Sequence, residues 1–328
     1  MKSGILKTIL LRFFSSLLTL FLLISFLFVL IRLSPGNPTD KYISAKLGSE
    51  LSDKISEKFS LNQPIADQYF AFVTNVFKGD LGISYNYRQP VFEIIWEYFS
   101  FTLVFAITSF ILQIGMSIWL SMWVIKRRSK LLDNFISNSA ILVYSVPAFV
   151  LGVALIYIFS VEWNLFPISG LHSLDFESFS FFGKVFDTLH HLVLPLITLT
   201  SAGVAMFYKY TKDSMDEVLS QTFITNLVSY GLDSNSILKK HVIPNSLRPI
   251  ISVAGIELGI LLGGTLITEV IFSLPGMGRL TIDSILSRDY PLVIGCVFTA
   301  GAVMIIANFL ADIFKLKLDK RLLKGILN

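Results

Sequence analysis

The residues of this sequence that could do chemistry are three carboxylates set in long apolar stretches, Glu257, Glu269 and Asp312. Ionisable side chains at membrane depth are costly, and they are usually kept for a function. Glu257 and Glu269 are twelve residues apart, which places them about 120° apart around one helix at about 100° per residue. They therefore do not form a paired-carboxylate catalytic site on that helix.

Motifs for nucleotide or hydrolytic chemistry are absent from the sequence. Without G-x-x-x-x-G-K-[ST] the chain cannot cradle the phosphates of ATP, and without H-E-x-x-H or G-x-S-x-G a hydrolase is not indicated. The pair His190-His191 is expected to lie at a helix start rather than to bind a metal. Cys296 is the only cysteine, so it is expected to be a small core residue. We therefore expect no enzyme, no metal site and no cofactor bound by this chain.

The composition indicates a membrane protein. The chain has 328 residues, of which 53% are hydrophobic and only 15% charged, whereas a soluble domain carries about 25% charged residues. The first apolar stretch is too long for a signal peptide and lacks a small-residue cleavage site, so it is expected to stay as a helix. Pro195 leaves the start of the fourth stretch uncertain. We expect an all-α integral membrane protein with six transmembrane helices, near residues 10–31, 100–125, 135–160, 189–208, 249–272 and 291–314.

The distribution of basic residues predicts the orientation. The N-terminus, residues 126–134, residues 209–248 and the C-terminal tail together carry 17 Lys and Arg, and the intervening segments carry 10 Lys and Arg against 14 acidic residues. The positive-inside rule then places both termini in the cytoplasm. The short run KRRSK at 126–130 is the clearest indication.

Residues 33–99 are predicted to be an extracytoplasmic helical insertion between the first two spans. The run ISAKLGSELSDKISEKF is typical of an amphipathic helix, and Asn62-Gln63-Pro64 breaks it. A second helical run, IADQYFAFVTNVFKG, ends at Gly79, a suitable C-cap. The insertion could pack as a cap on the outer mouth or serve as a docking surface for a partner.

A polar interruption over residues 217–245 separates two apolar stretches of membrane length. A transporter powered by a partner outside the membrane needs a rigid protruding element that transmits the partner's motion to the membrane helices without bending. Residues 212–229 favour a helix, because apolar residues recur on one face at helical spacing. These residues are Met215, Val218, Leu219, Phe223, Leu227 and Val228.

Beyond this helix we expect a turn and a second short helix. Gly231 is expected to break the first helix, and Asp233 or Ser234 to cap a second one over residues 235–242. The product is a hairpin that could fit a cleft of a partner, and the alternative is an ordinary solvated loop. Two prolines are expected to end the second helix before the fifth span, Pro244 and Pro249.

Two further features lie near the fifth span. Glycines at 255, 259 and 263 form a small-xxx-small row suited to close helix packing. Pro275, Gly276 and Gly278 predict a tight non-helical turn over residues 273–279 at the outer mouth. Arg279 is near enough in sequence to neutralise Glu269, so this segment could gate a pathway, and the alternative is a plain loop.

Several segments together closely resemble the permease family of peptide and nickel ABC importers, specifically the first of its two paired membrane subunits. The spacing from Gly231 to the Val242-Ile243-Pro244 run resembles the loop by which such a subunit contacts its ATPase. The resemblance covers nearly the whole length, in matching order and spacing. The segments that carry it are NQPIADQYFAFVTNVFKGDLGISY, YSVPAFVLGVALIYIFS, LFPISG, HLVLPLITL, EVIFSLPGMGRL, SRDYPLV and Leu318-Asp319-Lys320-Arg321.

The resemblance implies a type I ABC importer permease fold in the cytoplasmic membrane of a bacterial cell, with one transmembrane domain over residues 1–328 and a coupling loop over 212–247. The implied partners are a homologous second permease, two cytoplasmic ATPases that hold ATP–Mg, an extracytoplasmic substrate-binding protein and membrane lipid, with no nucleic acid. The implied ATPase-coupling residues are Glu217, Gly231, Leu232, His241, Pro244 and Asn245. The candidate gate or pathway residues are Glu257, Glu269, Pro275, Gly276, Gly278 and Arg279.

One departure from the family pattern affects the partner. Where the family has Arg-Thr-Ala-Arg-Ala-Lys before the glycine, this sequence has Thr225-Asn226-Leu227-Val228-Ser229-Tyr230. The hairpin therefore has bulkier and less charged side chains than the family pattern, which implies a dedicated ATPase partner.

Oligopeptides or dipeptides are the expected cargo, and nickel or a nickel chelate is the alternative. A secondary transporter would need ion-coupling acids and inverted repeats, and neither is visible in the sequence. An exporter or channel component would not need the Gly231 hairpin.

Overall fold

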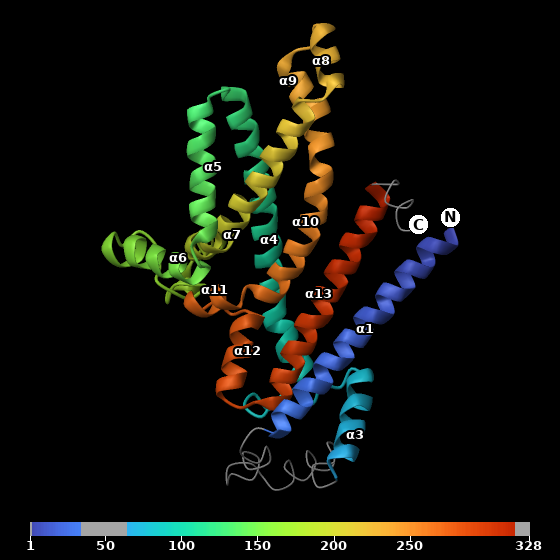
Figure 1. Ribbon diagram of the computed structural model, residues 1–328. Coiled ribbons are helices and arrows are strands. Elements are labelled where there is room, and N and C mark those ends of the chain that lie inside the picture. Colours follow the sequence, from blue (N-terminus) through green and yellow to red (C-terminus); the bar gives the residue numbers. More distant parts are fainter. Residues whose placement is uncertain (1, 34–63, 319–328) are drawn as a thin grey trace. The chain divides into compact units, whose positions relative to one another are not determined.

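The computed structural model describes residues 2–33 and 64–318, and helices dominate this part of the chain (Figure 1). Outside the helices, an isolated antiparallel bridge joins Ile83 and Pro90. The chain divides into two compact units. The first unit comprises Met1–Phe101 and Gly276–Val303, and the second comprises Thr102–Pro275 and Met304–Asn328.

The first unit holds α1 (Lys2–Leu33), α3 (Ile65–Phe77), α12 (Met277–Leu286) and the opening turns of α4 (Val91–Arg127) and α13 (Tyr290–Leu318). The sequence-predicted end of α3 is confirmed, because Gly79 has φ 77° and follows the last helical turn. Residues 91–99, at the end of the predicted insertion, are helical and form the first turns of α4. The helix expected over ISAKLGSELSDKISEKF lies outside the described residues.

A buried carboxylate organises the start of α13 in the first unit. Asp289 is fully buried and accepts hydrogen bonds from the Ser84 hydroxyl at 2.5 Å and from the Asn86 backbone N–H at 3.0 Å. It also accepts from the Leu292 N–H at 3.4 Å, which caps the helix. The loop before α4 is thereby attached to the loop before α13.

The second unit is organised around one long helix, α7. This helix contacts α5, α6, α10 and α11, and its buried residues extend along most of its 39-residue length. The elements of the unit besides α7 (Phe181–Leu219) are α5 (Lys130–Ser145), α6 (Ala148–Leu155), α8 (Thr222–Ser229), α9 (Ser234–Ile237), α10 (Ile243–Gly264) and α11 (Leu266–Ile271), together with most of α4 and the end of α13.

The stretch predicted as one span near 135–160 is not one straight helix. The chain forms α5, breaks at Val146, and continues as α6 and a π-helical stretch over Ile156–Glu162, with a bend of 99° between the two parts. The cause is Pro147, because the residue before a proline avoids the helical region and Val146 has φ −81° and ψ 123°. The pair is therefore either one broken span or a re-entrant segment.

Four helices of the described chain are long and apolar enough to cross a membrane: α4, α7, the stretch Val253–Ile271 and Tyr290–Leu310 of α13. The bent pair α5–α6 would be a fifth, and α1 contains a shorter apolar run, Phe13–Val29. The uncertainty at Pro195 is resolved, since α7 continues through this residue. The chain is therefore an all-helical membrane protein with four or five such helices among its described residues.

The packing of α4 against α7 depends on the lack of a side chain at Gly203. A Cβ atom on Gly203 of α7 would lie 2.2 Å from Cδ of Gln113 on α4. Gln113 is fully buried, and its amide donates to the Leu199 carbonyl at 3.3 Å. The small-xxx-small row of α10 has a milder role, because a Cβ on Gly259 would lie 3.5 Å from Asn308 of α13.

Candidate functional site

The predicted hairpin is present at the end of the second unit that carries α8 and α9 (Figure 1). The single helix expected over 212–229 is wrong, because α7 ends at Leu219 and α8 begins at Thr222 after a break. Gln221 at this break has an extended backbone, with φ −75° and ψ 144°. Residues 222–229 therefore form a separate short helix that can take its own direction.

The turn of the hairpin has the predicted chemistry. Gly231 has φ 77°, its N–H donates to the Val228 carbonyl at 2.9 Å, and the Leu232 N–H donates to the Leu227 carbonyl at 3.2 Å. This is a Schellman motif, in which glycine ends a helix without strain. Of the two candidate caps for the next helix, Asp233 is the one used, and it accepts the N–H groups of residues 235 and 236.

The expected end of the second hairpin helix at the prolines is wrong. A π-helical stretch over Leu238–Val242 follows α9 and leads directly into α10, with Pro244 in its first turn. Proline has a φ close to the helical value at this position, and it lacks the N–H that another residue would donate to the preceding turn. Position 249 is also inside α10. No non-helical residue therefore separates the second helix of the hairpin from α10.

A buried apolar cluster attaches the hairpin to the long helices. Partly buried residues of α4 pack against it, among them Ile118 and Met122. Burial of each such side chain contributes about 1.5–3 kcal/mol, so the cluster resists separation of the hairpin from α7 and α4. Its buried members are Met215, Val218, Ile224, Ile237, Leu238 and Val242.

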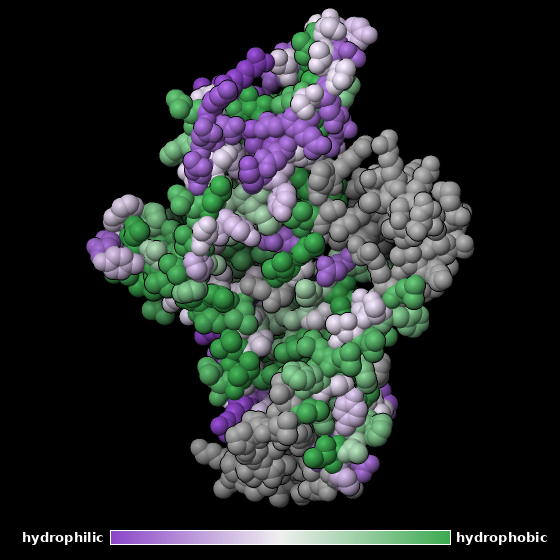
Figure 2. Space-filling view, viewed as in Figure 1, coloured by the Kyte–Doolittle hydropathy of each residue, from purple (hydrophilic) through white to green (hydrophobic). Residues whose placement is uncertain are grey.

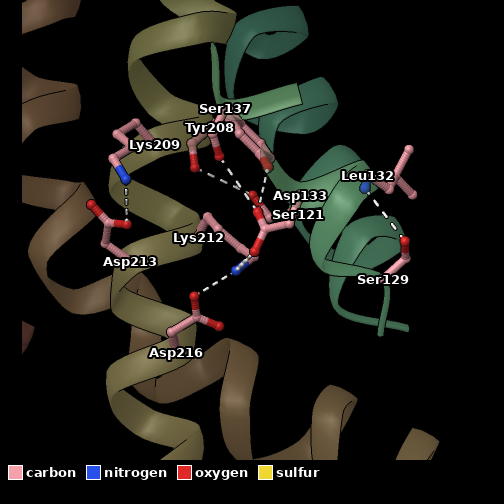
Figure 3. Close-up of polar contacts among 10 residues, drawn as sticks. All are labelled: Ser121, Ser129, Leu132, Asp133, Ser137, Tyr208, Lys209, Lys212, Asp213 and Asp216. Atoms are coloured by element: carbon pink, nitrogen blue, oxygen red, sulfur yellow. Dashed lines mark hydrogen bonds and ion pairs between the residues drawn. The ribbon is translucent and has the colours of Figure 1, made fainter. Parts of the chain in front are cut away.

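An ion-pair network lies beside this cluster (Figure 3). Lys212 of α7 has a side chain only 8% exposed, and its ammonium lies 3.0 Å from Oδ2 of Asp133 on α5 and 2.5 Å from Oδ2 of Asp216 on α7. Two hydroxyls also donate to Asp133, from Tyr208 at 3.5 Å and Ser137 at 3.4 Å. The network joins α5 to the last turns of α7, where the hairpin starts.

Sequence reasoning did not select this network. The i,i+4 spacing of Lys212 and Asp216 is a recognisable helix pair, but nothing in the sequence connects it to Asp133, which is 79 residues from Lys212.

The predicted coupling residues lie around the hairpin without forming one cluster. Glu217 is exposed on α7, whereas Gly231 and Leu232 are at the turn. The other three are at the start of α10 or just before it: His241 is half-buried, Pro244 and Asn245 are exposed, and the Asn245 amide donates to the His241 carbonyl at 2.7 Å.

The predicted gate residues are divided between the two units. Glu257 is half-buried on α10, and Glu269 is fully buried on α11, where its Oε1 accepts the hydroxyls of Thr102 at 2.8 Å and Thr265 at 2.6 Å. Pro275 is the last residue of one segment of the second unit, and Gly276 is the first residue of the later segment of the first unit.

The predicted non-helical turn over 273–279 is too long. Gly276 has an extended backbone and caps α12, so Gly278 and Arg279 are already helical. The irregular stretch starts at Ser273, whose φ of 53° is left-handed. Nε of Arg279 lies 3.6 Å from Oδ2 of Asp283, which is one turn further along α12.

The two histidines expected at a helix start are instead inside α7. His190 Nε2 is 2.8 Å from the Leu165 carbonyl, and His191 Nδ1 is 2.8 Å from the Asp187 carbonyl. Among the described residues no group of three or more His, Cys, Asp or Glu side chains is placed to hold a metal ion.

A cavity of about 730 Å³ opens beside the ion-pair network. Its walls come from the α4–α5 turn, the end of α7 and the hairpin. Acidic and basic side chains line it together with apolar residues such as Ile224 and Leu238.

Two family models match the chain over adjacent segments. The model for "Binding-protein-dependent transport system inner membrane component" matches residues 113–324. The model for the N-terminal part of such membrane components matches residues 5–106.

Curated relatives match over nearly the whole chain. The oligopeptide transport system permease protein AppB of Bacillus subtilis is 31% identical over 296 residues, which are 90% of this chain and 92% of the relative. The nickel import system permease protein NikB of Staphylococcus aureus is 31% identical over 97% of this chain and 92% of its own length. The dipeptide transport system permease protein DppB of Escherichia coli is 31% identical over 87% of this chain and 89% of its own length.

Proposed function

This chain belongs to the family of binding-protein-dependent transport system inner membrane components, the peptide and nickel ABC importer permeases, and on that basis we propose that it forms the translocation pathway of an ATP-driven importer and couples it to partner ATPases. The observation that carries the coupling proposal is the hairpin over 220–242. Its base is attached to α4 and α7 by the buried cluster, and its turn at Gly231 is exposed.

The mechanism follows from how the hairpin is built. A partner that moves the exposed turn moves α7 and α10 as well, because the buried cluster and the Lys212–Asp133 ion pair resist local bending. The short helices α8 and α9 could dock in a cleft of an ATPase. ATP binding and hydrolysis on two such subunits would then rock the membrane helices of this chain against those of a second permease subunit.

We also propose the membrane topology of this chain, its partner subunits and its outer gate. The chain would be the first of the two paired permeases in a bacterial cytoplasmic membrane, with six spans and both termini inside. Residues 33–99 would form an extracytoplasmic insertion, and residues 212–247 the cytoplasmic coupling loop. An extracytoplasmic binding protein would deliver cargo. The candidate gate or pathway residues would contribute to an outer gate: Glu257, Glu269, Pro275, Gly276, Gly278 and Arg279. A double-mutant cycle in uptake with Glu269→Gln and Arg279→Gln would test this gate.

Oligopeptides or dipeptides are the cargo that we propose, since AppB and DppB carry those names. Nickel or a nickel chelate is the second candidate, because NikB is equally similar. Uptake of a labelled peptide and of radiolabelled nickel into cells with and without this chain separates the two. Import that persists without ATP but requires an ion gradient would instead indicate a secondary transporter.

Gly231→Trp tests the coupling proposal. A Cβ on Gly231 meets no atom within 4 Å, so the new side chain would project from the turn, and the left-handed backbone would also cost about 1–2 kcal/mol. We expect uptake and co-purification of the ATPase to fall together. Gly231→Asn is the control, because asparagine tolerates this backbone region. Normal uptake by an inserted Gly231→Trp protein would mean that the hairpin is not the coupling element.

A further inference from the structure

The α4–α5 turn carries a cluster of cations that have no anionic partner in the described part of the chain. Lys126, Arg128 and Lys130 are all exposed and line the 730 Å³ cavity. No ion pair joins any of the three to an acid among the described residues. Their ammonium and guanidinium groups are therefore available to a ligand from outside this part of the chain.

The acids that line the same cavity already have partners. Asp133 and Asp216 both contact the Lys212 ammonium. Asp233 accepts two backbone N–H groups at the start of α9. Because these carboxylates already have partners, the three cations of the turn are the charges left without an ion pair among the described residues that line the cavity.

The turn also has the features of a membrane–water boundary. It directly follows the membrane-length helix α4, whose last part carries Trp119 and Trp123 with stacked rings at 6.4 Å. Trp119 is 64% exposed, and tryptophan is enriched at the headgroup level of bilayers. Figure 2 shows hydrophilic side chains gathered over the end of the second unit that carries α8, α9 and this turn.

The helix that leaves the turn offers an apolar surface to acyl chains. No residue of α5 is buried. Its exposed side chains include Leu131 at 84%, Phe135 at 70% and Leu142 at 68%. A molecule with an anionic head and apolar tails therefore matches the cationic cavity and the helix beside it.

The backbone of the turn is held in an uncommon conformation. Arg128 has φ 50°, a left-handed value that is costly for a residue other than glycine. Such outliers persist where the surroundings enforce them, often at binding sites. This conformation reverses the chain after α4 and brings three basic residues within five positions to one side of the cavity.

We propose that the cavity between the α4–α5 turn and the hairpin binds the phosphate headgroup of an anionic phospholipid through Lys126, Arg128 and Lys130. The acyl chains lie along α5, and the headgroup fills the space between the turn and the hairpin. Polybasic segments next to a membrane helix attract anionic lipid in this way. A protein segment with acidic residues is a different occupant, and the test below separates it from lipid.

Native mass spectrometry of the purified full chain in detergent tests the proposal. We expect retention of phosphatidylglycerol over phosphatidylcholine, and a loss of this preference by at least about tenfold in Lys126→Gln/Arg128→Gln/Lys130→Gln. The matched control removes the same charge at exposed cations that do not line the cavity, Arg127→Gln/Lys239→Gln/Lys240→Gln. No preference in the unaltered chain, or an equal loss in both variants, would overturn the proposal.

Two further measurements place the lipid in the cavity. Asn235 lines the cavity from the hairpin side, so Asn235→Trp should lower phosphatidylglycerol retention with every cation kept. Unchanged retention in that variant would overturn the cavity assignment.

Inorganic phosphate at millimolar concentration should not displace the lipid, and full displacement would instead indicate a site for a soluble anion. Displacement by the co-purified ATPase would indicate an acidic protein segment as the occupant.

Discussion

The ammonium of Lys212 on α7 lies 3.0 Å from a carboxylate oxygen of Asp133 on α5, although the two residues are 79 positions apart. This pair joins α5 to the end of α7, and the buried apolar cluster attaches the hairpin to α7 and α4. A moving partner at the hairpin would therefore act on the helices through a stiff junction.

Lys212→Met should weaken this junction. The substitution leaves Asp133 and Asp216 close together without their shared cation, and both are partly exposed, so we expect a loss of about 1–2 kcal/mol. The thermal midpoint of the purified protein and its uptake activity report the effect. Lys209→Met is the control, because Lys209 pairs with Asp213 in an exposed position and should change stability by no more than about 0.5 kcal/mol. Equal effects of the two variants would contradict a special role for Lys212.

Gly203→Ala should disturb the contact between α4 and α7. The new Cβ would lie 2.2 Å from Gln113 Cδ, and overpacking of this kind costs about 1–3 kcal/mol. Gln113→Ala in the same protein should relieve the clash, so the double variant should be more stable than the sum of the single effects predicts. Gly115→Ala is the control, since nothing lies within 4 Å of its Cβ position. Additive losses would mean that the two residues do not meet.

Asp289→Ala should destabilise the first unit. The change removes the acceptor for the Ser84 hydroxyl and the Asn86 N–H and uncaps α13, which costs about 1–3 kcal/mol for buried groups left without a partner. Limited proteolysis of the loop over 80–90 and the thermal midpoint both measure it. Asp283→Ala, an exposed change on α12, serves for comparison, and resistance of the Asp289→Ala loop to protease at the level of the unaltered protein would refute the prediction.

Cysteine labelling tests the proposed orientation. In a Cys296→Ser background, a cysteine at position 49 should react with an impermeant thiol reagent in intact cells, because residues 33–99 are proposed to be extracytoplasmic. A cysteine at Ser129, next to the KRRSK run, should react after the membrane is permeabilised. The reverse pattern would invert the topology.

The sequence by itself determined the class of the molecule and the chemistry of its turns. Apolar length and low charge predicted membrane helices, and the left-handed backbone at Gly79 and Gly231 followed from glycine's lack of a Cβ atom. The cap of the next helix was equally local, and the sequence limited it to Asp233 or Ser234, of which the structure uses Asp233. These features depend on residues within a few positions of each other, so a single sequence reveals them.

Tertiary structure alone decided the long-range contacts and several helix boundaries. The direction taken after Pro147, the continuation of the chain through Pro195, and the helix over 243–264 depend on which neighbours satisfy the backbone groups that proline leaves unpaired. The pairing of Lys212 with Asp133 arises because packing of α5 on α7 brings together residues from distant parts of the chain. Residue spacing carries no information about such a contact, since it follows from the folded positions of two helices.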